Sequence, residues 1–219
     1  MMRSVLAGAL LMLLGSPAFS ADREVGGTPD SLQVAFDETI TTARRAIDKY
    51  GVTDSAMIRI QAALAQLASK PSLKDRDRFQ KLHGGAGVTA SMLASEGEDS
   101  ISLFIARFDT GHATPVHDHL TWGVIHVLEG RDRYIQWEYR YRDGDSSRAE
   151  IRQVKEMVLE PGGSTYWLPP PHDLHSQEGK GMPVWELVLA GRNLLSRNVI
   201  DHRHYYDPKT GSVTNTPPK

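Results

Sequence analysis

The chain contains 219 residues, of which 40% are hydrophobic and 24% charged, which is enough for one well-filled domain with an appendage. Its formal net charge of −2 argues against nucleic acid as a partner, because proteins that bind phosphate backbones usually carry a basic excess. The sequence has no cysteine, which excludes disulfides, thiolate nucleophiles and thiolate metal sites.

Residues 1–21 have the pattern of a secretory signal peptide. Arg3 precedes the apolar run Val5–Leu14, which at about ten residues is too short to span a bilayer. Ala18 and Ser20 then provide the small residues that a signal peptidase accepts. We therefore expect cleavage next to Ser20, a periplasmic or secreted protein, and no stable membrane span after cleavage. An uncleaved anchor is the alternative.

Residues 22–87 are predicted to form a helical N-terminal segment. Apolar residues recur at steps of three and four from Leu32 to Tyr50, which predicts an amphipathic helix. Gly51 follows as a natural C-terminal cap.

Two further helices are expected in this segment. One runs from Asp54 to the residue before Pro71. The sequence "SLKD" at residues 72–75 resembles a capping box and predicts a third, short helix that ends near His83. The helices show no recognisable chemistry, so we expect them to pack on one face of the domain that follows.

Residues 88–200 change to a period of two, which is typical of strands. In "RYIQWEYRY" the residues Ile135, Trp137, Tyr139 and Tyr141 share one face, and polar residues occupy the other. Further strands are predicted at residues 101–108, 122–129, 149–160, 164–169 and 183–191. Short strands with no helix between them predict a mainly β fold, an antiparallel sandwich or barrel.

Two histidines in "TPVHDHLTWGVIHVLEG" are the leading candidates for metal ligands. His117 and His119 are one residue apart on an extended segment, so both imidazoles leave the same face and Asp118 points to the other. A third ligand has to come from elsewhere, and "PPPHDLHSQEG" offers His172 and His175. Neutral imidazoles suit a borderline divalent metal.

The spacing around the two histidines is similar to the first motif of the cupins. That motif is written G-x5-H-x-H-x3,4-E-x6-G, and Gly111, His117, His119 and Gly130 are in register with it. Gly123 stands at the position of the motif's glutamate. The resemblance implies a cupin double-stranded β-helix, or jelly-roll barrel, that follows the helical segment.

Loss of the carboxylate with the histidines kept resembles one branch of the cupins, the cysteine dioxygenase-like thiol dioxygenases. "GHATPVHDHLTWGVIHVLEG" and "WLPPPHDLHSQ" look like the metal-binding segments of that branch, and the resemblance covers roughly residues 101–189. It implies that His117, His119 and His175 bind Fe(II), and that a small thiol is oxidised by O₂ to a sulfinic acid. Three-histidine sites also hold zinc, and manganese is a further alternative.

The chain departs from this branch in two places. Those enzymes have a Ser-x-His-x-Tyr network on a late strand, where Trp185, Leu187 and Leu189 stand here. They also place an arginine on an early strand to bind the amino-acid carboxylate, and the matching segment "TASMLASEGEDS" has none. We therefore expect a small thiol other than free cysteine.

Several other residues are candidates for the surroundings of the metal. Those that could line the cavity or support a ligand are His112, His172, Arg107 and Trp185. His126 is expected to face away from the metal, because its parity on the strand is opposite to that of its apolar neighbours. His202 and His204 repeat the H-x-H spacing, but we expect residues 201–219 to be a solvated tail.

Two alternatives to the dioxygenase are kept. The missing network favours a non-catalytic metal-binding cupin that binds a small ligand without turnover. A metal-dependent hydrolase or isomerase that uses a bound water is the other alternative. In each case the expected partner is a small molecule, and a homodimer is compatible with the apolar strand faces.

Overall fold

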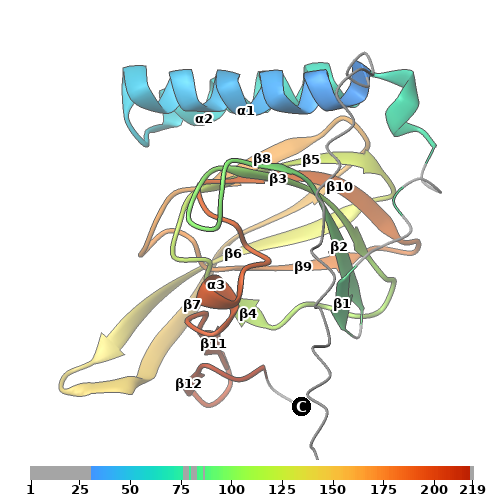
Figure 1. Ribbon diagram of the computed structural model, residues 1–219. Helices are drawn as coiled ribbons and strands as arrows, with labels where there is room; N and C mark the ends of the chain where they lie inside the picture. The colour runs from blue at the N-terminus through green and yellow to red at the C-terminus, as the bar shows by residue number, and fades with distance from the viewer. Residues whose placement is uncertain (1–30, 76–78, 80–82, 86, 218–219) are drawn as a thin grey trace, which may run out of the picture.

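The computed structural model describes residues 31–75, 79, 83–85 and 87–217 (Figure 1). The predicted signal peptide lies outside the described residues. Within the described part of the chain, no helix is long and apolar enough to cross a membrane.

Two antiparallel sheets of six strands each form the barrel (Figure 1). The first contains, in spatial order, β1 (His83–Gly85), β2 (Val88–Ser95), β3 (Ser102–Phe108), β10 (Val184–Ala190), β5 (Gly123–Glu129) and β8 (Ser164–Trp167). The second contains, in spatial order, β12 (Val213–Thr214), β11 (Tyr205–Tyr206), β4 (Val116–His117), β9 (His175–Gly179), β6 (Asp132–Arg142) and β7 (Asp145–Leu159). The predicted mainly β, double-stranded β-helix is confirmed, and every strand that the period of two indicated is present.

Two helices cover the first sheet from outside. α1 (Ser31–Tyr50) and α2 (Asp54–Ala68) lie side by side across it (Figure 1). Gly51, at φ +66°, ends α1 in the left-handed conformation that glycine adopts without strain. The buried stripes of both helices form one core with outward-facing strand residues such as Leu103 and Leu187. The helices therefore close one outer face of the barrel, as expected.

Residues 71–75 form a 3-10 turn where the third helix was predicted to begin. The turn η1 (Pro71–Leu73) has Pro71 in its first position and is capped by Lys74. At the expected end of that helix, His83–Gly85 form β1, which pairs with β2. The predicted start of the helix is wrong, because residues 71–73 form a single 3-10 turn. Residues 76–78 and 80–82, which make up most of the predicted helix, lie outside the described residues, and β1 begins where the helix was expected to end.

Successive side chains of β3 and β10 point alternately to the core under the helices and to the core inside the barrel. Leu103 and Leu187 face the helices, whereas Phe104 and Val188 face the barrel interior. Residues that share the parity of the second pair therefore point toward the space between the two sheets.

The segment after the barrel is folded onto it, which corrects the predicted solvated tail. After α3 (Arg197–Ile200), β11 pairs on one side with β4 and on the other with β12. Tyr206 is 3% exposed and packs with Val116 and Val213. Two paired residues are too short a strand to show a period of two, so the sequence pattern missed it.

β6 and β7 form a long hairpin that projects from the barrel (Figure 1). Trp137 and Tyr139 lie on the predicted common face, where both pack against the cluster that contains Tyr206. Tyr141 continues that face, and its hydroxyl is 3.3 Å from the hydroxyl of Tyr206. Tyr134, of opposite parity, is completely buried inside the barrel.

Candidate metal centre

The three predicted histidine ligands meet inside the barrel. His117 ends β4, His119 follows in the next loop, and His175 begins β9. β4 and β9 are neighbours in which His117 is directly opposite His175. The three residues are 7%, 7% and 1% exposed, and their ligand nitrogens all lie within 4.8 Å of one another.

Backbone carbonyl groups orient two of the three rings. The Nδ1 of His117 lies 2.8 Å from the carbonyl oxygen of Pro115, and that of His175 lies 3.0 Å from the carbonyl oxygen of Asp173. A carbonyl oxygen can only accept, so each Nδ1 carries the proton and each Nε2 keeps its lone pair. The Nε2 of His175 is buried without a hydrogen-bond partner among the described residues, which leaves it available to a metal ion.

All three imidazoles are neutral at physiological pH. Burial is the main cause that lowers the pKa of each ring, to about 3 for His175 and well below the ordinary value for His117 and His119. The positive charge of Arg203 lowers all three pKa values further. Protons therefore compete only weakly with a metal for these nitrogens.

This donor set fits one divalent transition metal ion. Two nitrogens bound to the same ion at about 2.1 Å are at most about 4.2 Å apart, so the widest pair closes slightly on binding. Three imidazole ligands leave coordination positions for a substrate, and iron, zinc and manganese all accept nitrogen donors of this kind. The histidine cluster, defined as His117, His119 and His175, is therefore able to hold a metal.

Trp167 occupies the space that a carboxylate ligand at position 123 would need. A Cβ atom added to Gly123 would collide with the six-membered ring of Trp167. That ring stacks on His119 at 5.2 Å and lies 4.6 Å from His175, centroid to centroid, and its Nε1 donates to the carbonyl oxygen of Thr121 at 2.9 Å. The sequence pattern assigned Trp167 only to the core, whereas it is a wall of the histidine cluster.

Arg203 lies beside His119 and was not predicted to belong to the site. Its Nη2 is 3.1 Å from the Nδ1 of His119. A guanidinium can only donate, so this Nδ1 accepts, and the proton of His119 is on Nε2, 3.1 Å from the Nε2 of His117. For a metal to bind through this Nε2 while the ring stays neutral, the proton of His119 has to move to Nδ1, and the hydrogen bond from Arg203 has to break.

The guanidinium of Arg203 is also a half-buried cation without a close anion among the described residues. Its Nε is buried and lacks a hydrogen-bond partner, and no carboxylate oxygen of the described residues lies within 4.0 Å of it. Burial lowers the pKa of Arg203, and Tyr205 and Asp118 oppose that effect. A buried, unpaired charge is costly, so this position favours a ligand that brings negative charge.

Asp118 points away from the histidine cluster, as expected, and ties β4 to β11. Its Oδ1 accepts the backbone N–H of His204 at 2.9 Å. Its Oδ2 lies 2.8 Å from the Nδ1 of His204 and accepts the hydroxyl of Tyr206 at 3.2 Å. His204 thus anchors the strand that carries His117, while His202 is exposed and bonds to a backbone carbonyl of its own segment.

Asp173 positions two of the ligands. Its carbonyl orients His175, and its Oδ2 accepts the backbone N–H groups of His119 at 3.1 Å and Leu120 at 2.7 Å. Leu120 has φ +57°, a left-handed conformation that is strained for a residue with a side chain. The carboxylate therefore holds the turn that aims His119, and burial raises its pKa to about 6.

Four residues that the sequence suggested for the cavity lie elsewhere. His112 and His172 are exposed. Arg107 stands between two interior-facing neighbours of β3, so its own side chain faces outward, where it pairs with Asp109. Trp185 also faces outward and packs against the core under the helices. The structure does not bring these four residues to the histidine cluster.

The interior face of β10 lacks the hydroxyl and imidazole groups of the thiol dioxygenase network. Trp185, Leu187 and Leu189, which the sequence placed at those positions, face the helices, and His126 pairs with Leu187 on the same outward face. The residues of β10 that face the interior are Val184, Glu186, Val188 and Ala190. Neither the outward-facing nor the interior-facing residues of β10 reproduce the Ser-x-His-x-Tyr network. Glu186 is the polar residue that β10 places inside the barrel.

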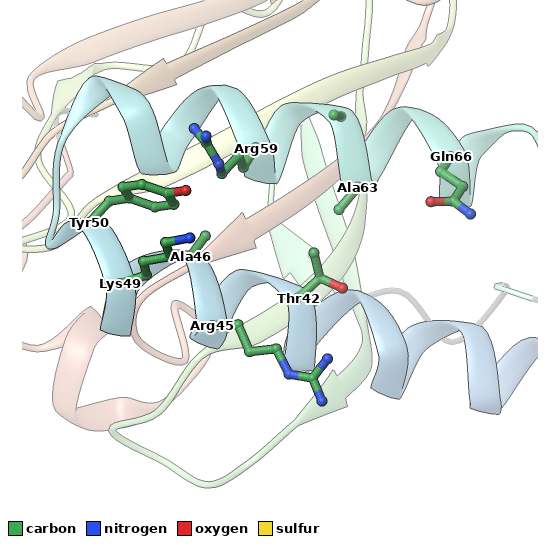
Figure 2. Close-up of a pocket in the computed structure, with 9 residues that line it drawn as sticks. Thr42, Arg45, Ala46, Lys49, Tyr50, Arg59, Ala63 and Gln66 are labelled. Atoms are coloured by element: carbon green, nitrogen blue, oxygen red, sulfur yellow. The ribbon is translucent and has the colours of Figure 1, made fainter.

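A groove of about 430 Å³ between α1 and α2 is separate from the histidine cluster (Figure 2). Lys49 and Arg59 lie over the ring of Tyr50, at 5.2 Å and 4.1 Å from its centroid. No imidazole or carboxylate lines this groove, so it offers no metal ligand.

The fold and the histidine cluster together define a double-stranded β-helix protein with a candidate metal centre inside its barrel. Comparison of the sequence with protein-family models and with curated proteins finds no match.

Several solved structures resemble the fold but share little sequence identity with this chain. An RmlC-like cupin from Shewanella frigidimarina is 21% identical, over 52% of this chain and 84% of its own, with a TM-score of 0.38. The DMSP lyase DddQ from Ruegeria pomeroyi is 18% identical, over 72% and 74%, with a TM-score of 0.39. KdgF from a Halomonas species is 12% identical, over 53% and 91%, with a TM-score of 0.40. The likeness is one of architecture alone.

Proposed function

We propose that the protein is an iron-dependent dioxygenase that oxidises a small anionic thiol to a sulfinic acid. The observation that carries this proposal is the donor set: three buried, neutral imidazoles, with Trp167 in the place of the carboxylate of the cupin motif. His117, His119 and His175 would hold Fe(II). When bound, the iron supplies positions at which a thiolate and O₂ come together, and both oxygen atoms end on sulfur.

The charge of the site supports a thiolate substrate. A divalent ion held by three neutral ligands keeps its full positive charge, and a thiolate offsets part of it. Arg203 adds a second, half-buried positive charge beside His119. We therefore propose a thiol that carries a further negative group, such as a carboxylate or sulfonate, within reach of this guanidinium.

Aromatic rings around the histidine cluster strengthen these attractions. Trp167 stacks on His119, and Tyr134 stacks on His175 with ring centroids 5.2 Å apart. Their bulk excludes water from the imidazoles, and a lower local dielectric makes a thiolate–cation pair more favourable than it is in water.

A non-catalytic metal-binding cupin is the second candidate. The observation that favours it is the interior face of β10, where no hydroxyl or imidazole stands beside the histidine cluster. Such a protein would hold a metal and an anionic ligand without consuming oxygen.

Metal analysis combined with oxygen uptake separates the candidates. The purified protein is assayed for iron, zinc and manganese and then given a panel of thiols with and without a carboxylate. The dioxygenase predicts bound iron and one sulfinate per O₂ consumed. Bound metal without oxygen uptake supports the non-catalytic metal-binding cupin. Hydrolytic or isomerase turnover with bound zinc supports a metal-dependent hydrolase or isomerase.

A pair of histidine variants tests the ligands themselves. His119→Ala should lose metal occupancy, while His202→Ala, an exposed histidine outside the cluster, should keep it. Full occupancy in His119→Ala would show that the ligands have been chosen wrongly. We further propose export, supported by residues 1–21, and N-terminal sequencing of the mature protein should begin next to Ser20.

A further inference from the structure

A second group of polar side chains is buried inside the barrel, away from the histidine cluster. Asp132 on β6 and Glu186 on β10 are both 0% exposed, and Gln177 on β9 is 5% exposed. They come from both sheets and face the same interior space. The proposed function uses none of these three residues.

One amide group joins the two carboxyl groups. The Nε2 of Gln177 donates to the Oδ2 of Asp132 at 3.2 Å and to the Oε2 of Glu186 at 3.0 Å. The second oxygen of each carboxyl, Oδ1 and Oε1, is buried and has no donor among the described residues. Because both carboxyl groups accept from the same nitrogen they are close neighbours, and a hydrogen bond between them lowers the pKa of Asp132 and raises that of Glu186. One free oxygen on each carboxyl group therefore lacks a hydrogen-bond donor, and a single proton shared by the two groups would supply it.

The surroundings supply no compensating positive charge. β3 and β5 place Ala106 and Val127 opposite Glu186, and β7 and β9 place Leu159 and Gly179 opposite Asp132. No nitrogen of a lysine, arginine or histidine among the described residues lies within 4.0 Å of either carboxyl group.

The other ionisable groups near the pair are acidic as well. The phenol of Tyr134 is buried without a hydrogen-bond partner, and the charges of Asp132, Glu186 and Asp173 all raise its pKa. Two full negative charges in such surroundings would be very unfavourable.

We infer that Asp132 and Glu186 share one proton, and that the loss of this proton as the pH rises destabilises the barrel. The proton completes the hydrogen bonding, because a protonated Glu186 donates to the free oxygen of Asp132. It also leaves a single negative charge, held by the amide of Gln177. The inference is independent of the metal and of the reaction that the barrel catalyses.

The direction of the pH effect follows from the ionisation of the pair. Burial raises the pKa of Asp132 to about 6, against its hydrogen bonds, and raises the pKa of Glu186 well above its ordinary value. A carboxyl group whose pKa rises on folding stabilises the protein at low pH, and this stabilisation is lost as the pH rises through the folded-state pKa. Unfolded carboxyl groups titrate near pH 4, so the loss begins there and continues as the pH rises through the raised pKa values of the folded pair.

Thermal unfolding of the full chain at a series of pH values tests this inference. Glu186→Gln replaces the proton-dependent donor by a permanent amide donor of the same shape. The Tm of the wild type should fall between pH 6 and pH 9 by at least about 3 °C more than that of the variant. Glu138→Gln, an exposed carboxylate of β6, is the matched control and should follow the wild type. Equal decreases in all three proteins would overturn the inference.

Infrared spectroscopy gives a readout that does not depend on a variant that folds. At neutral pH the wild type should show the carbonyl stretch of a protonated carboxylic acid, and the band should disappear reversibly as the pH is raised. Absence of the band in folded wild-type protein would contradict a shared proton. Where Glu186→Gln folds, the same band should be missing from its spectrum at neutral pH.

Discussion

Gly123 and Trp167 are directly opposite each other in neighbouring strands, and the indole ring lies where a side chain of residue 123 would begin. The absence of a carboxylate at this position is therefore built into the packing of the barrel, and it is coupled to the tryptophan that covers His119 and His175. The effect of a substitution at Gly123 or Trp167 therefore depends on which residue occupies the other position.

Gly123→Ala should destabilise the protein, because the added methyl group overlaps the ring of Trp167. We expect a loss of about 1–3 kcal/mol in the free energy of unfolding, measured by urea denaturation. In a Trp167→Ala background the same substitution should cost much less, and a double-mutant cycle reports the difference. Equal costs in both backgrounds would show that the two side chains do not compete for space.

Metal binding should depend only weakly on pH between about 5 and 8. The folded protein keeps its three imidazoles neutral because burial lowers their pKa values, to about 3 for His175, so protons are not displaced over this range. Ordinary histidines would instead lose affinity below about pH 6.5. Titration with Zn²⁺ or Co²⁺ at several pH values measures this, and a steep loss of affinity below 6.5 would contradict the neutral cluster.

Arg203→Met should weaken the binding of an anionic thiol while leaving the metal in place. Loss of one charge-assisted contact should raise the KM for a carboxylate-bearing thiol by about 10–100-fold, and a thiol without an anionic group should be little affected. Arg148→Met, which removes an exposed guanidinium of β7, is the control and should change neither value. An equal increase in KM for both thiols would exclude Arg203 as the anion partner.

Asp118→Ala should loosen the strand that carries His117. The substitution leaves the backbone N–H of His204 and the hydroxyl of Tyr206 without their acceptor, so we expect a loss of about 1–3 kcal/mol in stability. Metal affinity should fall as well, since β4 is only two residues long and depends on its neighbours. Asp145→Ala, at the exposed first residue of β7, serves as the control. Unchanged metal affinity in a destabilised Asp118→Ala protein would show that the hydrogen bonds of Asp118 do not position His117 for metal binding.

The sequence predicted the helices, the barrel strands and the histidines because each has a local signal. The helices α1 and α2 have a regular apolar stripe, and β3, β5 and β10 have apolar runs bounded by turns. His117 and His119 share a face because of their spacing alone. These features depend on neighbours in the chain, so they can be recognised without the fold.

The parts that could not be predicted depend on contacts between distant segments. Arg203 reaches His119 only because β11 pairs with β4, and a strand of two residues leaves no pattern in the sequence. Trp167 looks like any other core tryptophan until its pairing with Gly123 is known. The outward position of Arg107 follows from its parity on β3, which the sequence pattern left unassigned.

The order of these segments along the chain has a consequence for how the centre matures. β4 receives its partner β9 late in the barrel, and its other neighbour, β11, follows the last barrel strand. Asp173, whose carbonyl orients His175, and His204, whose N–H group binds Asp118, are both synthesised after His117. The complete histidine cluster therefore forms only after the C-terminal segment has paired with the barrel.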